Sequence, residues 1–231
     1  MRVQVLLLIS AGLGSPALAD TPASRDYPVS AFSRVVVEGP YDVEIRDGAR
    51  PSASARGPQE QLDRLIMAVE GDALVVKTRH SNWSWGTGRN VTRVAITAPS
   101  LRSVQLSGSG NIALDQAKGA SFSAGVSGSG DLRIDRVEAS TLSLRITGSG
   151  DLAARGAAQS VTASVTGSGS IAAASLSTGD LVAAVTGSGD IDVGTTRTAK
   201  ATVTGSGDIR IAGQPSCTQR KTGSGSIRCG G

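Results

Sequence analysis

The amino-acid sequence predicts an all-β fold, a single-domain right-handed parallel β-helix (solenoid) with coils of about 18–20 residues. The main observation is a heptapeptide of the V-T-G-S-G-D-I type that occurs seven times in the 231-residue chain. Successive Gly-Ser-Gly cores begin 20, 20, 19, 20, 18 and 18 residues apart, and a period near 20 is typical of stacked coils. The first glycines of the copies are Gly108, Gly128, Gly148, Gly167, Gly187, Gly205 and Gly223.

The second observation is the alternation of apolar and polar residues on both sides of each motif. Leu181, Ala183 and Val185 precede one copy, and Ile191 and Val193 follow it. A period of two is typical of half-buried strands, whereas the glycines and hydroxyl residues disfavour a helix. Each Gly-Ser-Gly core is therefore expected to form a corner, where glycine adopts positive φ without a Cβ clash.

The stacking direction follows from the turns. An antiparallel meander would need two different turns for each pair of strands, but here one kind of turn recurs once per coil. Parallel stacking places like residues about 4.8 Å apart, and parallel crossovers are almost always right-handed. The hexapeptide period of left-handed β-helices does not occur in this sequence.

Residues 1–19 have the features of a secretory signal peptide. Arg2 precedes a short apolar run at 5–9, and Ala17-Leu18-Ala19 fits cleavage by signal peptidase. The apolar run is too short to span a bilayer, so no membrane span is expected. Loss of Arg2 lowers the formal net charge from +4 to +3, and so small an excess does not indicate a nucleic-acid partner.

The mature chain is expected to begin with a polar leader at 20–31, followed by one domain at 32–231 with the seven coils within 101–231. Strands are predicted at 32–39, 41–45, 74–78 and 91–98, and a loop at 50–58. Aromatic residues make up only 3% of the chain, which suits a narrow interior. Both ends of such a solenoid need caps, because open strand edges promote association.

The segment between this loop and the strand at 74–78 allows two interpretations. Leu62, Leu65, Ile66 and Val69 fall at i, i+3, i+4 and i+7, which predicts a short amphipathic helix. The competing interpretation is that 66–70 form a strand, which pairs with 74–78 across a Gly71-Asp72 turn.

The two cysteines, Cys217 and Cys229, lie six residues before and six residues after Gly223, on the predicted inward side of the last coil. In an exported chain we expect them to form a disulfide, which would close a short loop and contribute about 3 kcal/mol. The bond would fasten a coil that has a neighbour on one side only. A reactive thiol pair or a metal site is the alternative.

Three features together resemble one known family: the strand pair VVVEG-PYDVEI at 35–45, the first GSGNI at 108–112, and the run of V-[ST]-G-S-G-D-I coils. The family is a bacterial one, the putative auto-transporter adhesin with a head GIN domain. The resemblance extends over about residues 32–231. It implies a right-handed β-helical fold and little about activity, because the adhesin description is itself an inference from shape.

Two columns of motif hydroxyls are expected at the corner. One is Ser107, Ser127, Thr147, Thr166, Thr186, Thr204 and Thr222, and the other runs from Ser109 to Ser224 at the centre of each Gly-Ser-Gly. The structural interpretation is a ladder that satisfies backbone groups at the corner. The functional interpretation is a polar strip that binds a glycan or another repetitive polymer.

The position after the second glycine is mostly aspartate. Its residues are Asn111, Asp131, Asp151, Ser170, Asp190, Asp208 and Ser226. Stacked aspartates repel one another unless they are solvated or bridged by a cation, so a calcium ladder is one interpretation of this column. Calcium-binding nonapeptides place a residue between glycine and aspartate, and here aspartate follows glycine directly. We therefore expect local Asx turns, no metal site and no cofactor.

Chemistry and recognition have few other candidates. His80 is the single histidine, the G-x-S-x-G elbow of serine hydrolases does not occur, and the repeated Gly-Ser-Gly lacks the ending of a phosphate-binding loop. Trp83 and Trp85, within 81–90, offer either platforms for sugar rings or a cap over the open N-terminal end.

Taken together, these observations predict an exported, non-catalytic module of the cell envelope, of the adhesion type, in the periplasm or at the cell surface. Its partner would be a surface polysaccharide or an envelope protein. The alternative is a carbohydrate-active β-helix enzyme of the lyase or glycosidase type. Such an enzyme would need a patch of chemically distinct residues in the middle of the solenoid, whereas the coils are uniform.

Overall fold

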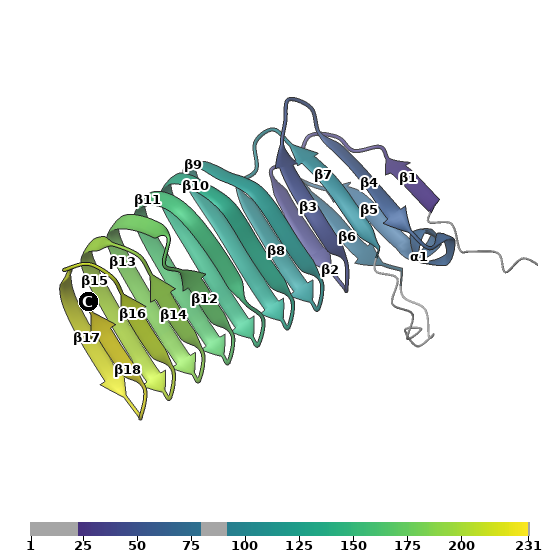
Figure 1. Cartoon of the computed structure of the whole chain (residues 1–231). Helices are drawn as coiled ribbons and strands as arrows, with labels where there is room; N and C mark the ends of the chain where they lie inside the picture. Colours follow the sequence, from purple (N-terminus) through teal and green to yellow (C-terminus); the bar gives the residue numbers. More distant parts are fainter. Residues whose placement is uncertain (1–22, 80–91, 231) are drawn as a thin grey trace, which may run out of the picture.

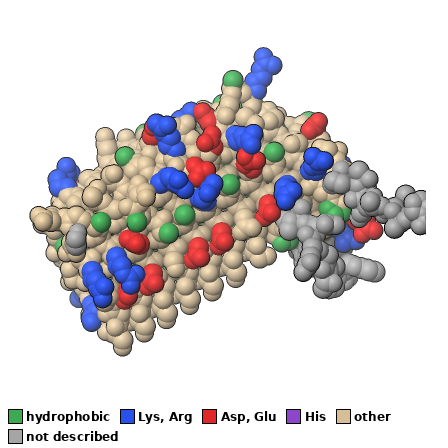
Figure 2. Space-filling model, viewed as in Figure 1, with side chains coloured by type: hydrophobic (Ala, Val, Ile, Leu, Met, Phe, Trp, Pro, Cys, Tyr) green, Lys and Arg blue, Asp and Glu red, His purple; other side chains and the backbone are tan. Residues whose placement is uncertain are grey.

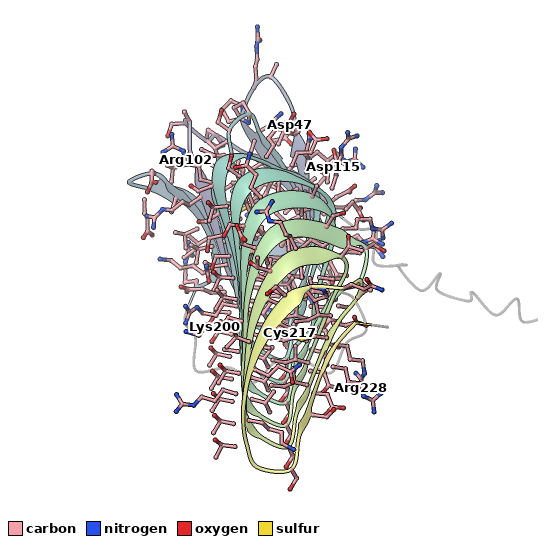
Figure 3. The ribbon with its side chains drawn as sticks, turned by 90° about the vertical axis from the view of Figure 1, so that its left-hand side faces the viewer. Asp47, Arg102, Asp115, Lys200, Cys217 and Arg228 are labelled. Carbon is pink, nitrogen blue, oxygen red and sulfur yellow. A yellow bond between two sulfur atoms is a disulfide. The ribbon has the colours of Figure 1, made fainter. Side chains whose placement is uncertain are left out.

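The computed structural model describes residues 23–79 and 92–230, and it confirms the predicted β-solenoid. One continuous sheet bends into two long faces that meet at the Gly-Ser-Gly corner (Figures 1 and 3). Three long strands run over both faces: β9 (Asn111–Gly128), β10 (Asp131–Gly148) and β11 (Leu152–Gly167). The coils stack in parallel with the motifs in register, since Gly148 pairs with Gly128 on one side and with Gly167 on the other.

The two faces differ in their outward side chains, and we name them accordingly. The hydroxyl face comprises the strands that lead into each corner: β2 (Arg34–Glu38), β6 (Ala73–Thr78), β8 (Ser103–Gly108), β13 (Leu176–Gly187), β15 (Thr196–Gly205), β17 (Ser216–Thr222) and the second halves of β9–β11. The aspartate face comprises the strands that leave each corner: β3 (Asp42–Asp47), β7 (Arg93–Ala98), β12 (Ser170–Ala173), β14 (Asp190–Val193), β16 (Asp208–Ile211), β18 (Ser226–Cys229) and the first halves of β9–β11. In the end-on view, Lys200 projects from the hydroxyl face and Arg228 from the aspartate face (Figure 3).

The core fills the narrow space between the faces with small aliphatic side chains. Around one corner, Val185, Ile191 and Val193 are all at most 1% exposed. Each apolar side chain packs on its equivalents in the neighbouring coils, because the register keeps like residues in contact, as for Val165, Val185 and Val203. The period-2 alternation of the sequence thus becomes one buried and one exposed surface on each strand.

The corner depends on its two glycines for different reasons. Gly187 has φ +122°, a backbone conformation that residues with a Cβ rarely adopt. Gly189 has no such torsion, but a Cβ there would collide with the carbonyl oxygen of Gly169 in the preceding coil. This close approach allows the N–H groups of Ser188 and Gly189 both to donate to the carbonyl oxygen of Gly167, at 2.9 and 3.0 Å.

The structure has a further corner, at Gly39, that does not carry the Gly-Ser-Gly motif. Gly39 has φ +127°, like the motif glycines, and its carbonyl oxygen accepts the N–H of Gly110 at 3.2 Å. Residues 34–47 therefore form a coil of the same kind, with Tyr41 in place of the second glycine. In space this coil lies between β6–β7 and β8–β9, because Val37 pairs with both Val76 and Leu106.

Antiparallel strands and one short helix cap the N-terminal end. On the aspartate face β4 (Ser52–Gly57) pairs antiparallel with β7, and β1 (Ala23–Tyr27) pairs with β4, so the loop expected at 50–58 is wrong. On the hydroxyl face β5 (Leu65–Glu70) pairs antiparallel with β6. The predicted helical stripe is wrong beyond Arg64, because α1 (Gln59–Arg64) ends there and the competing strand interpretation applies. Leu62 of α1 is 0% exposed and helps to close the interior.

The C-terminal end is capped by side-chain chemistry instead. The inward positions of the last coil carry Gln219 and Lys221, which pair in register with the buried Ala201 and Val203 of the coil before. Polar and charged side chains at inward positions of an edge strand prevent the addition of another strand. The predicted disulfide between Cys217 and Cys229 joins β17 to β18 across this end, with the Cα atoms 6.4 Å apart.

The two requirements at the corner can be separated with three alanine substitutions. Gly187→Ala would introduce both an unfavourable backbone torsion and a collision of the new Cβ with the preceding coil. Gly189→Ala would introduce the collision without the torsion. Gly119→Ala would introduce the torsion (φ +115°) without a collision, because nothing lies within 4 Å of the new Cβ. Backbone strain and overpacking each cost about 1–3 kcal/mol, so Gly187→Ala should lower the free energy of unfolding the most. Urea unfolding of the three variants measures this. Equal losses at Gly119 and Gly187 would show that the close approach contributes nothing.

The disulfide should stabilise the last coil specifically. Its 12-residue separation predicts a loss of about 3 kcal/mol in the double variant Cys217→Ser/Cys229→Ser. Amide hydrogen exchange should show lost protection in β17 and β18, with β9–β11 unchanged. In the native wild type both cysteines should resist alkylation until a reductant is added. A uniform loss of amide protection along the solenoid would contradict a local role of the disulfide. As a control, the reductant should leave the amide protection of the double variant unchanged.

Candidate functional site

The hydroxyl face is the most regular polar surface of the molecule. Its outward positions form columns of Ser and Thr that continue from coil to coil, because the register is kept from β8 to β17. The column nearest the corner is unbroken and exposed in seven coils: Ser107, Ser127, Thr147, Thr166, Thr186, Thr204 and Thr222. A second column, four residues earlier in each coil, carries Ser103, Ser123, Ser143, Thr162 and Thr218, interrupted by Val182 and Lys200.

These hydroxyls are available to a ligand. The hydrogen bonds of the corner join backbone groups to backbone groups, as in the donation from Ser188 N–H to the Gly167 carbonyl. Among the described residues, no hydrogen bond joins a side chain of either motif hydroxyl column to another residue. The interpretation of the columns as a ladder that satisfies the backbone is therefore wrong, and the hydroxyls face solvent as donors and acceptors.

The aspartate column forms an inter-coil ladder instead of local turns. Backbone N–H groups donate to the aspartate of the preceding coil: Asp151 N–H to Asp131 Oδ1 (3.2 Å), Ser170 N–H to Asp151 Oδ1 (2.9 Å), and Asp208 N–H to Asp190 Oδ1 (2.8 Å). The expected Asx turn is therefore wrong for these side chains. Figure 2 shows the ladder as a row of acidic groups along the solenoid, just above the corner.

Asp208, the last aspartate of the ladder, has a lowered pKa. The Ser226 hydroxyl and the Ser226 backbone N–H both donate to Asp208 Oδ1 at 2.9 Å, and these bonds, followed by the charges of Arg210 and Arg228, hold the pKa of the Asp208 carboxyl below its ordinary value. Hydrogen bonds of this kind stabilise the charged form. They tie the last coil to the coil before it.

Among the described residues, the ladder does not carry a cluster of metal-ligating side chains. Within 23–79 and 92–230, no three side chains from His, Cys, Asp and Glu gather closely enough to hold a metal ion. In the same segments, no helix is long and apolar enough to cross a membrane. The aspartates of the ladder instead accept hydrogen bonds from backbone N–H groups and lie beside arginines. One of these is Arg210, whose guanidinium lies 2.9 Å from Asp208.

The aspartate face also has a hollow near its N-terminal end. It has a volume of about 790 Å³ and lies where β4, β7, β3, β9 and β10 run side by side (Figure 1). Small side chains make the hollow, since Ala95 and Ala113 flank Glu44 in register and Ser54 faces Ala95. Charged side chains of both signs surround it. The sequence contained no signal for this site, because it depends on the antiparallel strand β4.

The other candidates of the sequence lie elsewhere. Trp83, Trp85 and His80 fall outside the described residues. The described residues that flank this segment, Arg79 and Thr92, follow β6 and precede β7, so they stand at the corner side of the outermost coil. The seven motif glycines line the corner beneath the hydroxyl face, and the two cysteines lie at the C-terminal end.

The hydrogen bonds of Asp208 predict a pH-dependent contribution to stability. Because its pKa is lower in the folded than in the unfolded chain, the contribution is present above the unfolded pKa of about 3.9 and is lost as the pH falls through the folded value. Asp208→Ala should therefore lower the thermal midpoint at pH 7, and the difference from wild type should shrink below pH 4. The control is Asp192→Ala, whose carboxylate accepts no hydrogen bond from a described residue and should give a smaller change at pH 7. A difference for Asp208→Ala that stays constant with pH would contradict the assignment.

The comparisons with known proteins agree with this geometry. The chain is similar to crystal structures of a putative adhesin from Bacteroides fragilis (TM-score 0.84, 22% identity, 90% of this chain and 97% of that chain), and of a putative lipid binding protein from Parabacteroides distasonis (TM-score 0.72, 22% identity, 90% and 96%). A putative adhesin from Parabacteroides merdae gives a TM-score of 0.68 at 19% identity, over 90% of this chain and 95% of that chain. At these identities the likeness is one of fold.

A match to curated proteins was not found. A family model does match, over residues 31–215, which is most of the chain. This range includes the coil around Gly39 and six of the seven Gly-Ser-Gly corners. The chain therefore belongs to the family described as putative auto-transporter adhesin, head GIN domain.

Proposed function

We propose that the protein is an exported, non-catalytic binding module of the cell envelope, of the adhesion type, and that its hydroxyl face binds an extended, hydroxyl-rich surface polymer. The observation that carries the proposal is the unbroken column of exposed hydroxyls along that face. The family and the adhesin-like neighbours support a binding role. The disulfide supports export, since such bonds persist mainly outside the cytoplasm.

The geometry suits a polymer better than a small molecule. Neighbouring hydroxyls of a column are one strand spacing apart, about 4.8 Å, and the column repeats this spacing through seven coils. A flat row gives little enclosure, so a single small ligand would gain few contacts. A chain of sugars could contact many coils at once, and the linked contacts would add avidity although each is weak in competition with water.

The chemistry of the face suits a hydroxyl-rich ligand. Ser and Thr side chains both donate and accept, so they can pair with sugar hydroxyls in either direction. Charged side chains at outward positions of the face lie mainly near its two ends and are few between them: Arg34, Glu38 and Lys77 toward the N-terminal end, Arg145 in the middle, and Asp180, Arg197, Lys200 and Arg220 toward the C-terminal end. The face therefore discriminates less by charge than the aspartate face does. Periplasm and cell surface are both consistent with this activity.

The proposal predicts that hydroxyls matter and that folding does not depend on them. A variant with Thr147→Val, Thr166→Val, Thr186→Val and Thr204→Val keeps side-chain shape and strand preference while it removes four hydroxyls from one column. It should fold with an unchanged thermal midpoint and lose about tenfold or more in binding, since several hydrogen bonds of about 0.5–1.5 kcal/mol each are removed. Depletion of the mature chain by cellulose, chitin and peptidoglycan sacculi measures binding.

The matched control is Thr97→Val with Thr195→Val, at positions outside the hydroxyl face. This control should bind like the wild type. Equal binding by the fourfold variant would contradict the assignment of the face. Release of reducing sugar ends from the same polysaccharides would instead indicate a carbohydrate-active enzyme and contradict the non-catalytic function.

A further inference from the structure

Two arginines stand directly opposite each other on the antiparallel pair β4–β7. Arg56 and Arg93 are register partners, and both are exposed. Their neighbours Ala55 and Val94 are buried, so both guanidinium groups lie on the outer side of the aspartate face. Like charges directly opposite each other on one face of a sheet destabilise the pairing. The juxtaposition of Arg56 and Arg93 therefore does not stabilise the fold, and it is unfavourable when only folding is considered.

The two carboxylates on β3 next to this pair, Asp42 and Glu44, have other partners, and Asp115 and Asp135 line the hollow further away, on β9 and β10. Among the described residues, neither Arg56 nor Arg93 forms an ion pair. Glu44 receives two bonds from Arg46, at 2.9 and 2.6 Å. Asp42, the register neighbour of Arg93 on β3, accepts the side-chain amide of Asn111 at 2.9 Å.

The pair also lies at the edge of a space that a ligand could enter. Both arginines line the hollow of about 790 Å³ described above, together with Ser24 and Ser54. Ser24 is the register partner of Arg56 on β1, which places its hydroxyl next to that guanidinium in the sheet. Arg56 and Arg93 thus offer two planar donor groups, and the two serines offer hydroxyls, around one open volume.

We propose that Arg56 and Arg93 form a binding site for a single oxyanion group, a phosphate or a carboxylate, carried by a ligand that occupies this hollow. Guanidinium groups bind such oxyanions with paired, charge-assisted hydrogen bonds. A bound anion would also remove the repulsion between the two arginines. The site lies on the opposite face from the hydroxyl columns, so it is independent of the proposed polymer binding.

The test uses the mature chain with sodium phosphate, phenyl phosphate, acetate and glucuronate as separate probes, in calorimetric titration at low salt. Binding of either phosphate or carboxylate probes should saturate, and the two sets distinguish the sources of the oxyanion. Arg56→Gln and Arg93→Gln should each weaken the binding about tenfold or more, because each removes charge-assisted hydrogen bonds. Added salt should weaken binding in the wild type. Arg197→Gln, the same change on an exposed arginine far from the hollow, should leave it within about twofold of wild type.

Thermal midpoints separate this role from a structural one. Without an oxyanion, Arg93→Gln should unfold at the same temperature as the wild type or higher, because a repulsion is removed. With the bound probe present, the wild type should gain in midpoint and Arg93→Gln should not. A lower midpoint of Arg93→Gln without any probe would assign the pair to structure and overturn the proposal. The absence of saturable binding for all four probes, or equal binding by wild type and both variants, would also overturn it.

Discussion

The solenoid depends on one contact, the approach of each corner to the carbonyl oxygen of the corner before it. In most coils two successive N–H groups donate to one glycine carbonyl, as Ser149 and Gly150 do to Gly128 at 2.8 and 3.0 Å. The approach is so close that a Cβ at the second glycine would collide with backbone. Since the contact recurs in nearly the same geometry, each coil has little freedom to shift along its neighbour. The register of both faces follows from it.

This register converts a repeated sequence into two continuous surfaces with different chemistry. Residues that precede the corner at outward positions become columns of hydroxyls, and residues that follow it become the aspartate ladder. The ladder shows how the two kinds of contact cooperate. Asp190 accepts the N–H of Asp208, and Asp208 accepts that of Ser226, so carboxylates carry the connection from coil to coil just beyond the corner. Charged groups thereby stabilise the stack although they are exposed.

Much of this arrangement could be predicted from the sequence, because the period and the alternation are local signals. The parallel stack, the corner and the disulfide are of this kind. Three features could not be predicted, each for a physical reason. The coil at Gly39 was not predicted because Tyr41 replaces the second glycine of the motif. Strand β4 was not predicted because its antiparallel pairing with β7 depends on residues far away in the chain. The aspartate ladder could not be predicted because each carboxylate accepts a backbone N–H from the next coil, and this donor can be identified only when the register of the coils is known.

The hollow beside β4 could not be predicted from the sequence for the same reason. Arg56 and Arg93 are 37 residues apart, and their pairing follows from the antiparallel addition of β4 to the solenoid. Local patterns placed Arg56 in a loop and Arg93 in a strand, with no relation between them. The alternation of buried and exposed residues then decides that both side chains lie on one side of the sheet.

The different chemistry of the two ends has a consequence for the length of the molecule. The N-terminal cap contacts the first coils, and Gln219, Lys221 and the disulfide lie in the last coil. The coils between them touch their neighbours alone, and they present the same corner above and below. A duplication of 18–20 residues between Gly148 and Gly187 would therefore insert one coil and leave both caps intact. The length of the solenoid can therefore change by whole coils, while the two caps and the repeating surface pattern stay the same.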